Sequence, residues 1–360
     1  MTRLGDVCEI RYGKDHKKLS DGSIPAYGSG GIIRYVDTAI CEKPSVLIPR
    51  KGTLGNLFYT DKPFWTVDTL FWTNIDQTKI VPKYLYYQLK QKDLASYNVG
   101  TAVPSLTVEI LNEIDFEVPS IDKQKRIVEV LNSFDSKIAL NNQLNDYLEQ
   151  LVDGKFQELF GGLNFNATLS DVAEITMGQS PAGSSYNEEG AGIIFYQGRG
   201  EFGWRFPKRR LYTTEPKRLA CEGDVLMSVR APVGDLNVAF ENCCIGRGLA
   251  AIHSETPSFA LYLMRFLKPQ LEAYNGEGTV FGSINGKALK SLEVALPSHN
   301  EVMQFESFAA PIDALIRSNE NETRKLNNLR NYLLPKLMSG EIDVSKVDLT
   351  QLTNNHLAAC

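Results

Sequence analysis

The sequence predicts an α+β protein in which two mainly β regions alternate with two long helices, as an internal repeat with pseudo-two-fold symmetry. Residues 100–162 align with residues 278–340 without insertion or deletion, so that Asn141 falls on Asn319. Both repeated segments carry apolar residues at spacings of three and four, whereas the regions before them are rich in glycine, aromatic and β-branched residues. We expect the two helices to pair as an antiparallel coiled coil.

The two β-rich regions, called heads below, are expected to be irregular because their strand-like runs are short and broken by glycine. Such runs lie at 27–33, 45–49, 64–67, 193–196 and 224–229. Each head should also hold one helix, near 82–91 and 258–271 respectively. The predicted boundaries are 1–120 for the first head, 121–162 for the central spacer helix, 163–298 for the second head, 299–345 for the C-terminal spacer helix and 346–360 for a tail.

The apolar stripes of the two spacer helices predict the seam of the coiled coil, or a surface for partner proteins. On the first helix they comprise Ile127, Leu131, Phe134, Ile138, Leu148 and Leu151, and on the second Ile312, Ile316, Leu326, Leu329 and Leu333. Asn141 and Asn319 fall on the same seam, where a buried polar residue costs stability but fixes the register. The alternative is two ordinary amphipathic helices that each pack on their own head.

Composition indicates an ordinary globular protein. The chain has 43% hydrophobic and 22% charged residues, and no apolar run approaches the roughly 18 residues that cross a membrane. Its start resembles no signal peptide, and its six cysteines form no C-x-x-C pair and have no histidine at ligand spacing. We therefore expect a cytoplasmic protein with no membrane partner and no metal site.

The net charge of −5 argues against nucleic acid as a partner, but the charge is unevenly distributed. Between Arg199 and Arg218 lie seven basic residues, opposed only by Glu201 and Glu215. Arginine pairs bidentately with guanine, and both arginine and lysine neutralise phosphates. The DNA-contact candidates here are Arg199, Arg205, Lys208, Arg209 and Arg210, interleaved with aromatic residues. The alternative is a solvated hairpin whose aromatic residues face the core.

Weaker candidates for DNA contact occur at matching places in the two heads. Arg50 and Lys51 follow a predicted strand of the first head, and Arg230 follows a related strand of the second. The Gly-Thr turns at Thr101 and Thr279 could donate backbone N–H groups to phosphate, although a structural junction before each helix is the alternative.

Motifs of catalysis or cofactor binding are missing from the sequence: there is no P-loop, no H-E-x-x-H and no G-x-S-x-G. Residues 198–203 fit a dinucleotide-binding glycine pattern, but Trp204-Arg-Phe-Pro207 does not open the helix that should receive a pyrophosphate. We expect no catalytic residue and no cofactor in this chain. An enzyme that binds a nucleotide at 198–203 is the alternative that this pattern leaves.

Several short motifs occur twice in the same order. They are Leu4-Gly-Asp-Val7 with Leu169-Ser-Asp-Val172, the segments 100–106 and 278–284, and the apolar-Pro-Ser boundaries at 118–120 and 296–298, followed by the C-terminal segment 333–342. In this arrangement the chain resembles the specificity (S) subunit of type I restriction-modification enzymes.

This resemblance implies a non-catalytic DNA-binding subunit whose heads are target recognition domains. Each would read one half of a split, asymmetric sequence in double-stranded DNA. The helices would act as a spacer and dock two methyltransferase (modification) subunits, and through them restriction subunits. S-adenosylmethionine, ATP and Mg²⁺ would belong to these partners. Two alternatives stay open: a specificity subunit whose partner fuses nuclease and methyltransferase, and a coiled-coil adaptor that binds no DNA.

Overall fold

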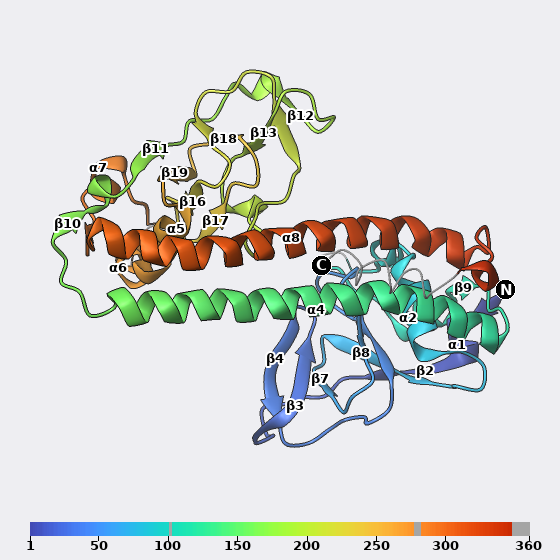
Figure 1. Ribbon diagram of the computed structural model, residues 1–360. Coiled ribbons are helices and arrows are strands. Elements are labelled where there is room, and N and C mark those ends of the chain that lie inside the picture. The colour runs from blue at the N-terminus through green and yellow to red at the C-terminus, as the bar shows by residue number, and fades with distance from the viewer. Residues whose placement is uncertain (101–102, 277–281, 348–360) are drawn as a thin grey trace. The chain divides into compact units, whose positions relative to one another are not determined.

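The computed structural model describes residues 1–100, 103–276 and 282–347. The chain forms two compact units, of which unit 1 comprises residues 1–140 and the segment from Glu322 onward, and unit 2 comprises Asn141–Asn321. Each unit therefore holds one head and one half of each long helix (Figure 1). The helices are α1 Leu4–Val7, α2 Pro82–Lys90, α3 Val108–Asn112, α4 Ile121–Phe160, α5 Pro257–Phe266, α6 Lys268–Glu272, α7 Gly286–Lys290 and α8 His299–Met338.

The head of unit 1 contains three small sheets. A four-stranded antiparallel sheet has the order β2 (Cys8–Tyr12), β8 (Leu70–Ile75), β5 (Ser45–Pro49) and β6 (Phe58–Thr60). A three-stranded sheet has the order β4 (Gly31–Val36), β3 (Asp21–Gly28) and β7 (Trp65–Thr66), and β1 (Thr2–Arg3) pairs with β9 (Asp115–Phe116).

The head of unit 2 repeats this plan. Its four-stranded antiparallel sheet has the order β11 (Glu174–Met177), β19 (Leu249–His253), β16 (Val225–Ser228) and β17 (Leu236–Val238), and β10 (Ala167–Thr168) pairs with β20 (Glu293–Val294). A five-stranded sheet has the order β12 (Tyr186–Asn187), β14 (Leu211–Thr213), β13 (Ile193–Tyr196), β18 (Cys243–Ile245) and β15 (Leu219–Ala220). The repeat seen in the sequence thus extends to the strand order of the heads.

The repeated sheet explains why some residues recur. Strands β5 and β16 are central in their sheets and wholly buried, which accounts for their continuous apolar runs. Gly13 and Gly178 follow the equivalent strands β2 and β11. A Cβ atom would lie 2.1 Å from the carbonyl oxygen of Val67 at Gly13, and 2.2 Å from that of Gly246 at Gly178. Both positions therefore need glycine for the close approach of a neighbouring backbone.

The long helices pack antiparallel within each unit. In unit 1, Asp135 of α4 pairs with Arg330 of α8 at 2.7 Å, and Lys137 pairs with Glu322 at 3.2 Å. In unit 2 the ring centroids of Phe156 and Phe305 lie 5.3 Å apart. The predicted α+β class, with two β-rich regions and two long helices packed together, is confirmed. Helix α8 ends at Met338, before the expected boundary at 345, and Gly340 beyond it has a left-handed φ of +78°.

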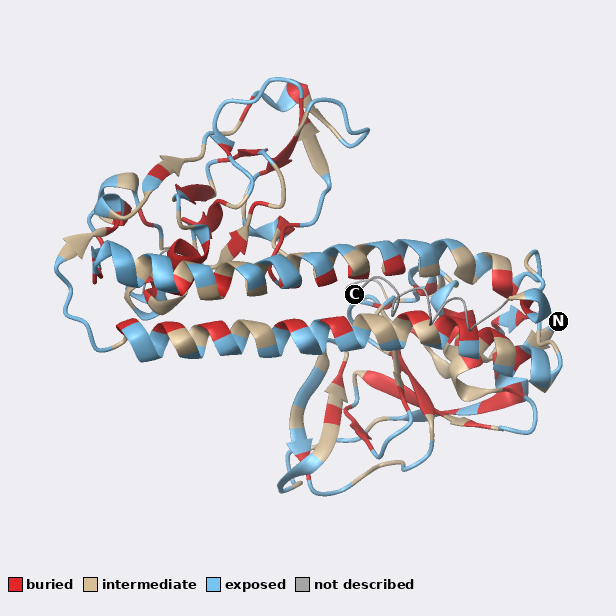
Figure 2. Cartoon of the chain, viewed as in Figure 1, coloured by how far each residue is buried: buried red, intermediate tan, exposed pale blue. Residues whose placement is uncertain are grey.

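Each unit has its own large apolar core, as the buried residues in Figure 2 show. In unit 1, α2 and the sheet pack on α4 residues such as Leu131 and on α8 residues such as Leu337. In unit 2, α5 and the sheet pack on Val152 and Phe156 of α4 and on Phe305 of α8. Of the helices in the described part of the chain, none is long and apolar enough to cross a membrane.

Candidate nucleic-acid interface

The basic stretch of unit 2 forms the loop between β13 and β14, residues 197–210, which we call the basic loop. Lys208, Arg209 and Arg210 are exposed at its end, and Arg199 is exposed at its start. Arg199 pairs with Asp235 at 3.1 Å, Arg210 pairs with Glu201 at 2.7 Å, and Arg209 pairs with Glu241. Exposed ion pairs contribute little stability, so these cations can exchange a carboxylate for a phosphate at small cost.

Arg205 lies in the same loop but does not face solvent. Its side chain is only 4% exposed, and its guanidinium pairs with Asp313 at 2.9 Å and Glu149 at 3.0 Å. It also donates a hydrogen bond to the Tyr262 hydroxyl at 3.2 Å. Burial acts to lower the pKa of Arg205, but Tyr262 and the two carboxylates outweigh it and the pKa is raised. The expectation that Arg205 contacts DNA is therefore corrected, because its guanidinium is buried and pairs with two carboxylates inside the unit.

The rest of the basic loop is held against its own head. The Asn237 side chain of β17 accepts a hydrogen bond from the backbone N–H of Gly203 and donates one to its carbonyl oxygen. The rings of Phe206 and Phe240 meet edge to face at 5.3 Å. Residues 199–201 form a single 3-10 turn and no α-helix follows them, so the glycine pattern at 198–203 lacks the helix N-terminus of a dinucleotide site.

The strand-end cations of the two heads occupy equivalent places. Lys51 forms an isolated antiparallel bridge with Ser105, and Arg230 forms one with Ser283. Each cation is exposed and lies beside the segment that leads into the next helices of its unit. The structure thus brings these cations next to Ser105 and Ser283, and the candidates Thr101 and Thr279 lie outside the described residues. Arg50 is half-buried, donates to the Asp68 carbonyl oxygen at 3.1 Å and stacks over Tyr12.

One exposed feature of the first head was not anticipated from the sequence. The β3–β4 hairpin carries Ile32, Ile33 and Tyr35, each about half exposed. Ser29 at the hairpin tip accepts a hydrogen bond on its carbonyl oxygen from the Asn56 side chain, so the tip lies beside the loop that follows Lys51. The sequence signal was the alternation of glycine with large apolar residues, which predicted a strand but did not show its exposure.

The residues expected in the helix seam fall into three groups by burial. Buried are Ile127, Leu131, Phe134, Asn141, Ile316, Asn319 and Leu326; half-buried are Ile138, Leu148, Ile312 and Leu333; exposed are Leu151 and Leu329. The two asparagines meet within unit 2, where the Asn141 amide donates to the Asn319 carbonyl oxygen at 3.4 Å and the Asn319 amide donates to Asn145 at 2.8 Å.

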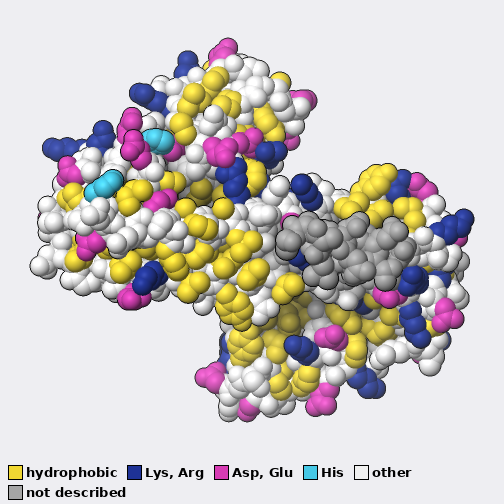
Figure 3. Space-filling model, viewed as in Figure 1, with side chains coloured by type: hydrophobic (Ala, Val, Ile, Leu, Met, Phe, Trp, Pro, Cys, Tyr) yellow, Lys and Arg dark blue, Asp and Glu magenta, His cyan; other side chains and the backbone are white. Residues whose placement is uncertain are grey.

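Leu151 and Leu329 do not lie in the buried seam as expected, since they are 54% and 42% exposed. Beyond Leu148 the buried positions of α4 are Val152, Phe156 and Phe160. Steps of four residues exceed the 3.6 residues of one turn, so the buried face rotates away from Leu151. In unit 2, Leu144, Tyr147 and Leu151 form a second, exposed apolar face of α4, and hydrophobic side chains gather on the surface there (Figure 3).

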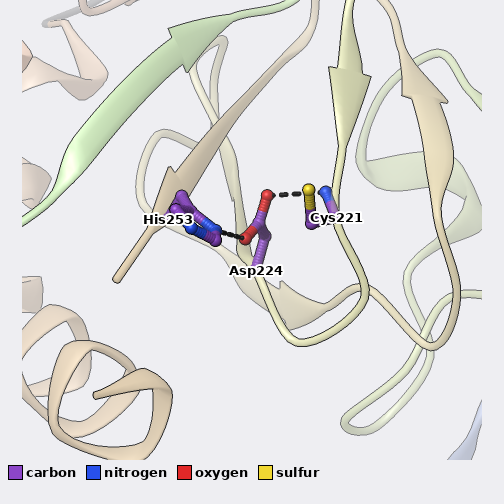
Figure 4. A group of neighbouring side chains, drawn as sticks. All are labelled: Cys221, Asp224 and His253. Atoms are coloured by element: carbon purple, nitrogen blue, oxygen red, sulfur yellow. Dashed lines mark hydrogen bonds and ion pairs between the residues drawn. The ribbon is translucent and has the colours of Figure 1, made fainter. Parts of the chain in front are cut away.

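Cys221, Asp224 and His253 come together in unit 2 although the sequence spacing gave no sign of it (Figure 4). His253 Nδ1 lies 2.6 Å from one Asp224 carboxylate oxygen, and the other accepts the backbone N–H of Cys221 at 2.8 Å. The hydrogen bond from Asp224 raises the pKa of His253. Both oxygens of the buried Asp224 carboxylate are thus engaged by the protein. These hydrogen bonds account for the cluster, because they hold the turn before β16 to His253 of β19.

Comparisons with known proteins agree with this architecture. The model of the type I restriction modification DNA specificity domain matches residues 1–150 and 166–331. The chain is 34% identical over 298 residues to a putative type I restriction enzyme specificity subunit, MjaX, of Methanocaldococcus jannaschii, with 75% of this chain and 70% of the relative covered. It is 23% identical to the MjaIX specificity subunit of the same organism, over 88% of this chain and 81% of the relative.

Among solved structures, the S subunit of a type I restriction-modification system from M. genitalium has the same fold. The TM-score is 0.62 at 17% identity, and 93% of this chain and 95% of that chain are covered. The family model covers most of the chain in two copies, one for each head with its helix. The chain therefore belongs to the type I restriction-modification DNA specificity family and is a non-catalytic, DNA-recognising specificity subunit.

Proposed function

We propose that this subunit recognises an asymmetric, two-part sequence in double-stranded DNA, with each head reading one half. The observation that carries the proposal is a contrast between two parts of the repeat. The long helices and the four-stranded sheets, which we call the frame, are alike in both halves, whereas the exposed loops of the heads differ. The four-stranded sheets of both heads share one strand order, and each head has a strand-end cation bridged to a serine, Ser105 or Ser283. The exposed loops differ, because the first head offers the apolar hairpin of Ile32 and Ile33 and the second offers the cations of the basic loop.

The chemistry of these loops fits different tasks in one DNA complex. In this proposal Lys51 and Arg230 contact phosphates, and such contacts fix the position of a head without reading sequence. Arg209 and Arg210 can pair with guanine in the major groove, whereas Ile32 and Ile33 offer apolar contacts of the kind made with thymine methyl groups. Two identical contact sets would read a repeated or palindromic target, and two unlike sets read an asymmetric one.

The proposal is tested by mapping methylated adenines in cells that carry this subunit with its methyltransferase. We expect one motif with two defined halves and an unspecified gap. Replacing Arg209 and Arg210 with alanine should relax or abolish one half only, and replacing Ile32 and Ile33 with alanine should affect the other half only. An uninterrupted palindromic motif, or loss of both halves from one head's variant, would contradict the proposal.

We further propose that the exposed apolar faces of the helices dock two methyltransferase subunits. Leu151 and Leu329 are equivalent in the repeat, lie one in each unit, and are both exposed. Leu151 is joined by Leu144 and Tyr147, and Leu329 by Tyr332, which is 62% exposed. Two matching apolar surfaces suit two identical partners. In this assembly S-adenosylmethionine belongs to the methyltransferases, ATP and Mg²⁺ belong to restriction subunits bound through them, and the complex works in the cytoplasm.

Stoichiometry tests the docking proposal. Leu151→Lys or Leu329→Lys should each leave one methyltransferase per subunit by native mass spectrometry, and the double variant should leave none. Asn142→Lys serves as a matched control, since Asn142 is exposed on a different face of α4. Two bound methyltransferases in the double variant would rule out this surface.

A further inference from the structure

We infer that Arg205 is a positioning residue that anchors the basic loop to the helices of unit 2, and thereby sets the accuracy with which the second head reads its half-site. The inference rests on the proposed function of that loop. Arg205 itself touches no DNA in this assignment, because its guanidinium is enclosed by protein. Its effect reaches the DNA through Lys208, Arg209 and Arg210, which follow it by three to five residues.

The contacts of Arg205 reach three helices at once. Nη1 of the guanidinium pairs with Asp313 of α8, and Nη2 bonds both Glu149 of α4 and Tyr262 of α5, whereas the buried Nε has no hydrogen-bond partner. Charge-assisted hydrogen bonds with this forked geometry fix direction as well as distance. The loop is thus tied to the helices at Arg205 by a contact that tolerates little displacement.

Next to this contact the basic loop stands away from the helices. A cleft of about 740 Å³ separates Phe202 and Gly203 of the loop from Asp153, Gln157 and Arg265 of the helices. Continuous apolar packing therefore does not hold this part of the loop to the helices. Arg205 ties the loop to α4 and α8 directly, whereas Phe206 is linked to α8 through Phe240, whose carbonyl oxygen accepts a hydrogen bond from Arg317.

Unit 1 neutralises the equivalent carboxylate with a different arginine. Asp135 of α4 is the repeat equivalent of Asp313 and likewise accepts a hydrogen bond from a tyrosine, Tyr87 of α2. Its arginine partner, Arg330, comes from the other long helix, α8, and Lys83 of α2 lies farther away at 3.8 Å. The position equivalent to Arg330 in unit 2 is the apolar Val152. In unit 2 the arginine that pairs with this carboxylate comes instead from the basic loop.

Arg265 offers a matched control. It shares Glu149 with Arg205 at 2.9 Å and pairs with Asp153 at 2.6 Å, but it belongs to α5 and not to the loop. Arg265→Met therefore removes a cation from the same ion-pair network while leaving the loop anchored. A change seen with Arg205→Met and not with Arg265→Met reports on the loop.

The experiment uses the full complex with its methyltransferase and measures methylation rates on duplexes with single base changes in either half-site. We expect Arg205→Met to reduce discrimination at the second head's half-site about tenfold, with the first half-site unchanged. Arg265→Met should leave discrimination at both half-sites unchanged. If Arg205→Met leaves discrimination intact, or if both variants reduce it equally, the positioning role is overturned.

Loss of the cation also removes a partner from two half-buried carboxylates, so stability must be separated from positioning. The double variant Arg205→Met/Asp313→Asn removes one of those charges, and we expect part of the stability to return while the second half-site stays relaxed. Recovery of discrimination together with stability would show a structural role only. A wild-type complex that reads no two-part motif would instead overturn the proposed function, whatever the variants do.

Discussion

Asp135 and Asp313 occupy the same position in the two repeats, and each is bonded by a tyrosine from a helix of its head. In unit 1 the arginine that neutralises the aspartate is part of the helix pair, whereas in unit 2 it is part of a head loop. The same frame therefore serves two kinds of head. The first head adds only the more distant Lys83, 3.8 Å from Asp135, to a pair that the helices already form, whereas the second head supplies the arginine itself.

The largest expected effect on the free energy of unfolding comes from substitutions at the buried apolar positions of this frame. Phe305 and Ile127 are equivalent, and both are buried. Phe305 meets the rings of Phe156 and Phe160 at 5.3 and 5.7 Å. We expect Phe305→Ala to lower the free energy of unfolding of unit 2 by about 4 kcal/mol, and Ile127→Ala to lower that of unit 1 by about 3 kcal/mol.

Urea unfolding followed by tryptophan fluorescence measures both changes, because Trp65 and Trp72 report on unit 1 and Trp204 reports on unit 2. In a Trp204→Phe background only unit 1 is observed. A Phe305→Ala variant that unfolds unit 1 as strongly as unit 2 would argue against separate cores.

The two aspartates should differ in their contribution to stability. Asp313→Asn weakens the charge balance around Arg205, whose side chain is 4% exposed, and should cost about 3 kcal/mol. Asp135→Asn affects Arg330, which is 20% exposed and better solvated, and should cost about 1 to 2 kcal/mol. The same unfolding assay compares them, and equal losses would contradict the contrast between the units.

The strand-end cations should instead behave alike. Lys51→Ala and Arg230→Ala each remove one exposed cation at equivalent places. We expect each to weaken DNA binding by the full complex severalfold on any sequence, and to reduce the slope of log affinity against log salt by about one. Fluorescence anisotropy at several salt concentrations provides the measurement, with Lys125→Ala, which changes an exposed lysine of α4, as control. A change in the methylation motif would assign these residues to base reading instead.

The smallest expected effect is the pH dependence of the His253–Asp224 pair, which only the second head has. Asp224 raises the pKa of His253, so the folded protein holds this proton more tightly than the unfolded chain does. The resulting stability is complete below the ordinary histidine pKa of about 6.5 and is lost as pH rises through the raised value. His253 is half exposed, so solvent screens the pair and the contribution stays below about 1 kcal/mol.

His253→Asn should therefore lower the melting temperature slightly at pH 6 and leave it nearly unchanged at pH 9. Thermal unfolding at the two pH values compares wild type and variant. A larger loss at high pH would mean that His253 acts through its neutral form.

The sequence predicted the frame well because periodicity and repetition report directly on helices and their buried faces. Ile127, Ile316 and Asn141, which this periodicity assigns to the inner faces of the helices, are buried. The loop residues were harder, since Trp204 and Arg205 are neighbours and no period tells which side chain turns inward. The arginine was expected to be exposed and the aromatic residue to be buried. The structure shows the reverse, since Arg205 is buried and Trp204 is 42% exposed. Cys221 and His253 meet only through the pairing of distant strands, which spacing in the sequence cannot reveal.

The division of the chain has a consequence for how the protein is made. Unit 2 is one continuous segment, whereas the core of unit 1 includes Leu326, Leu337 and Val344 from α8 and the turn beyond it. On the ribosome the first head emerges first, yet it lacks these partners until the last segment has been translated. The second head has all its residues by Asn321 and can fold while synthesis continues. The head made first is thus finished last, and its incomplete core is the part of the nascent chain most in need of a chaperone.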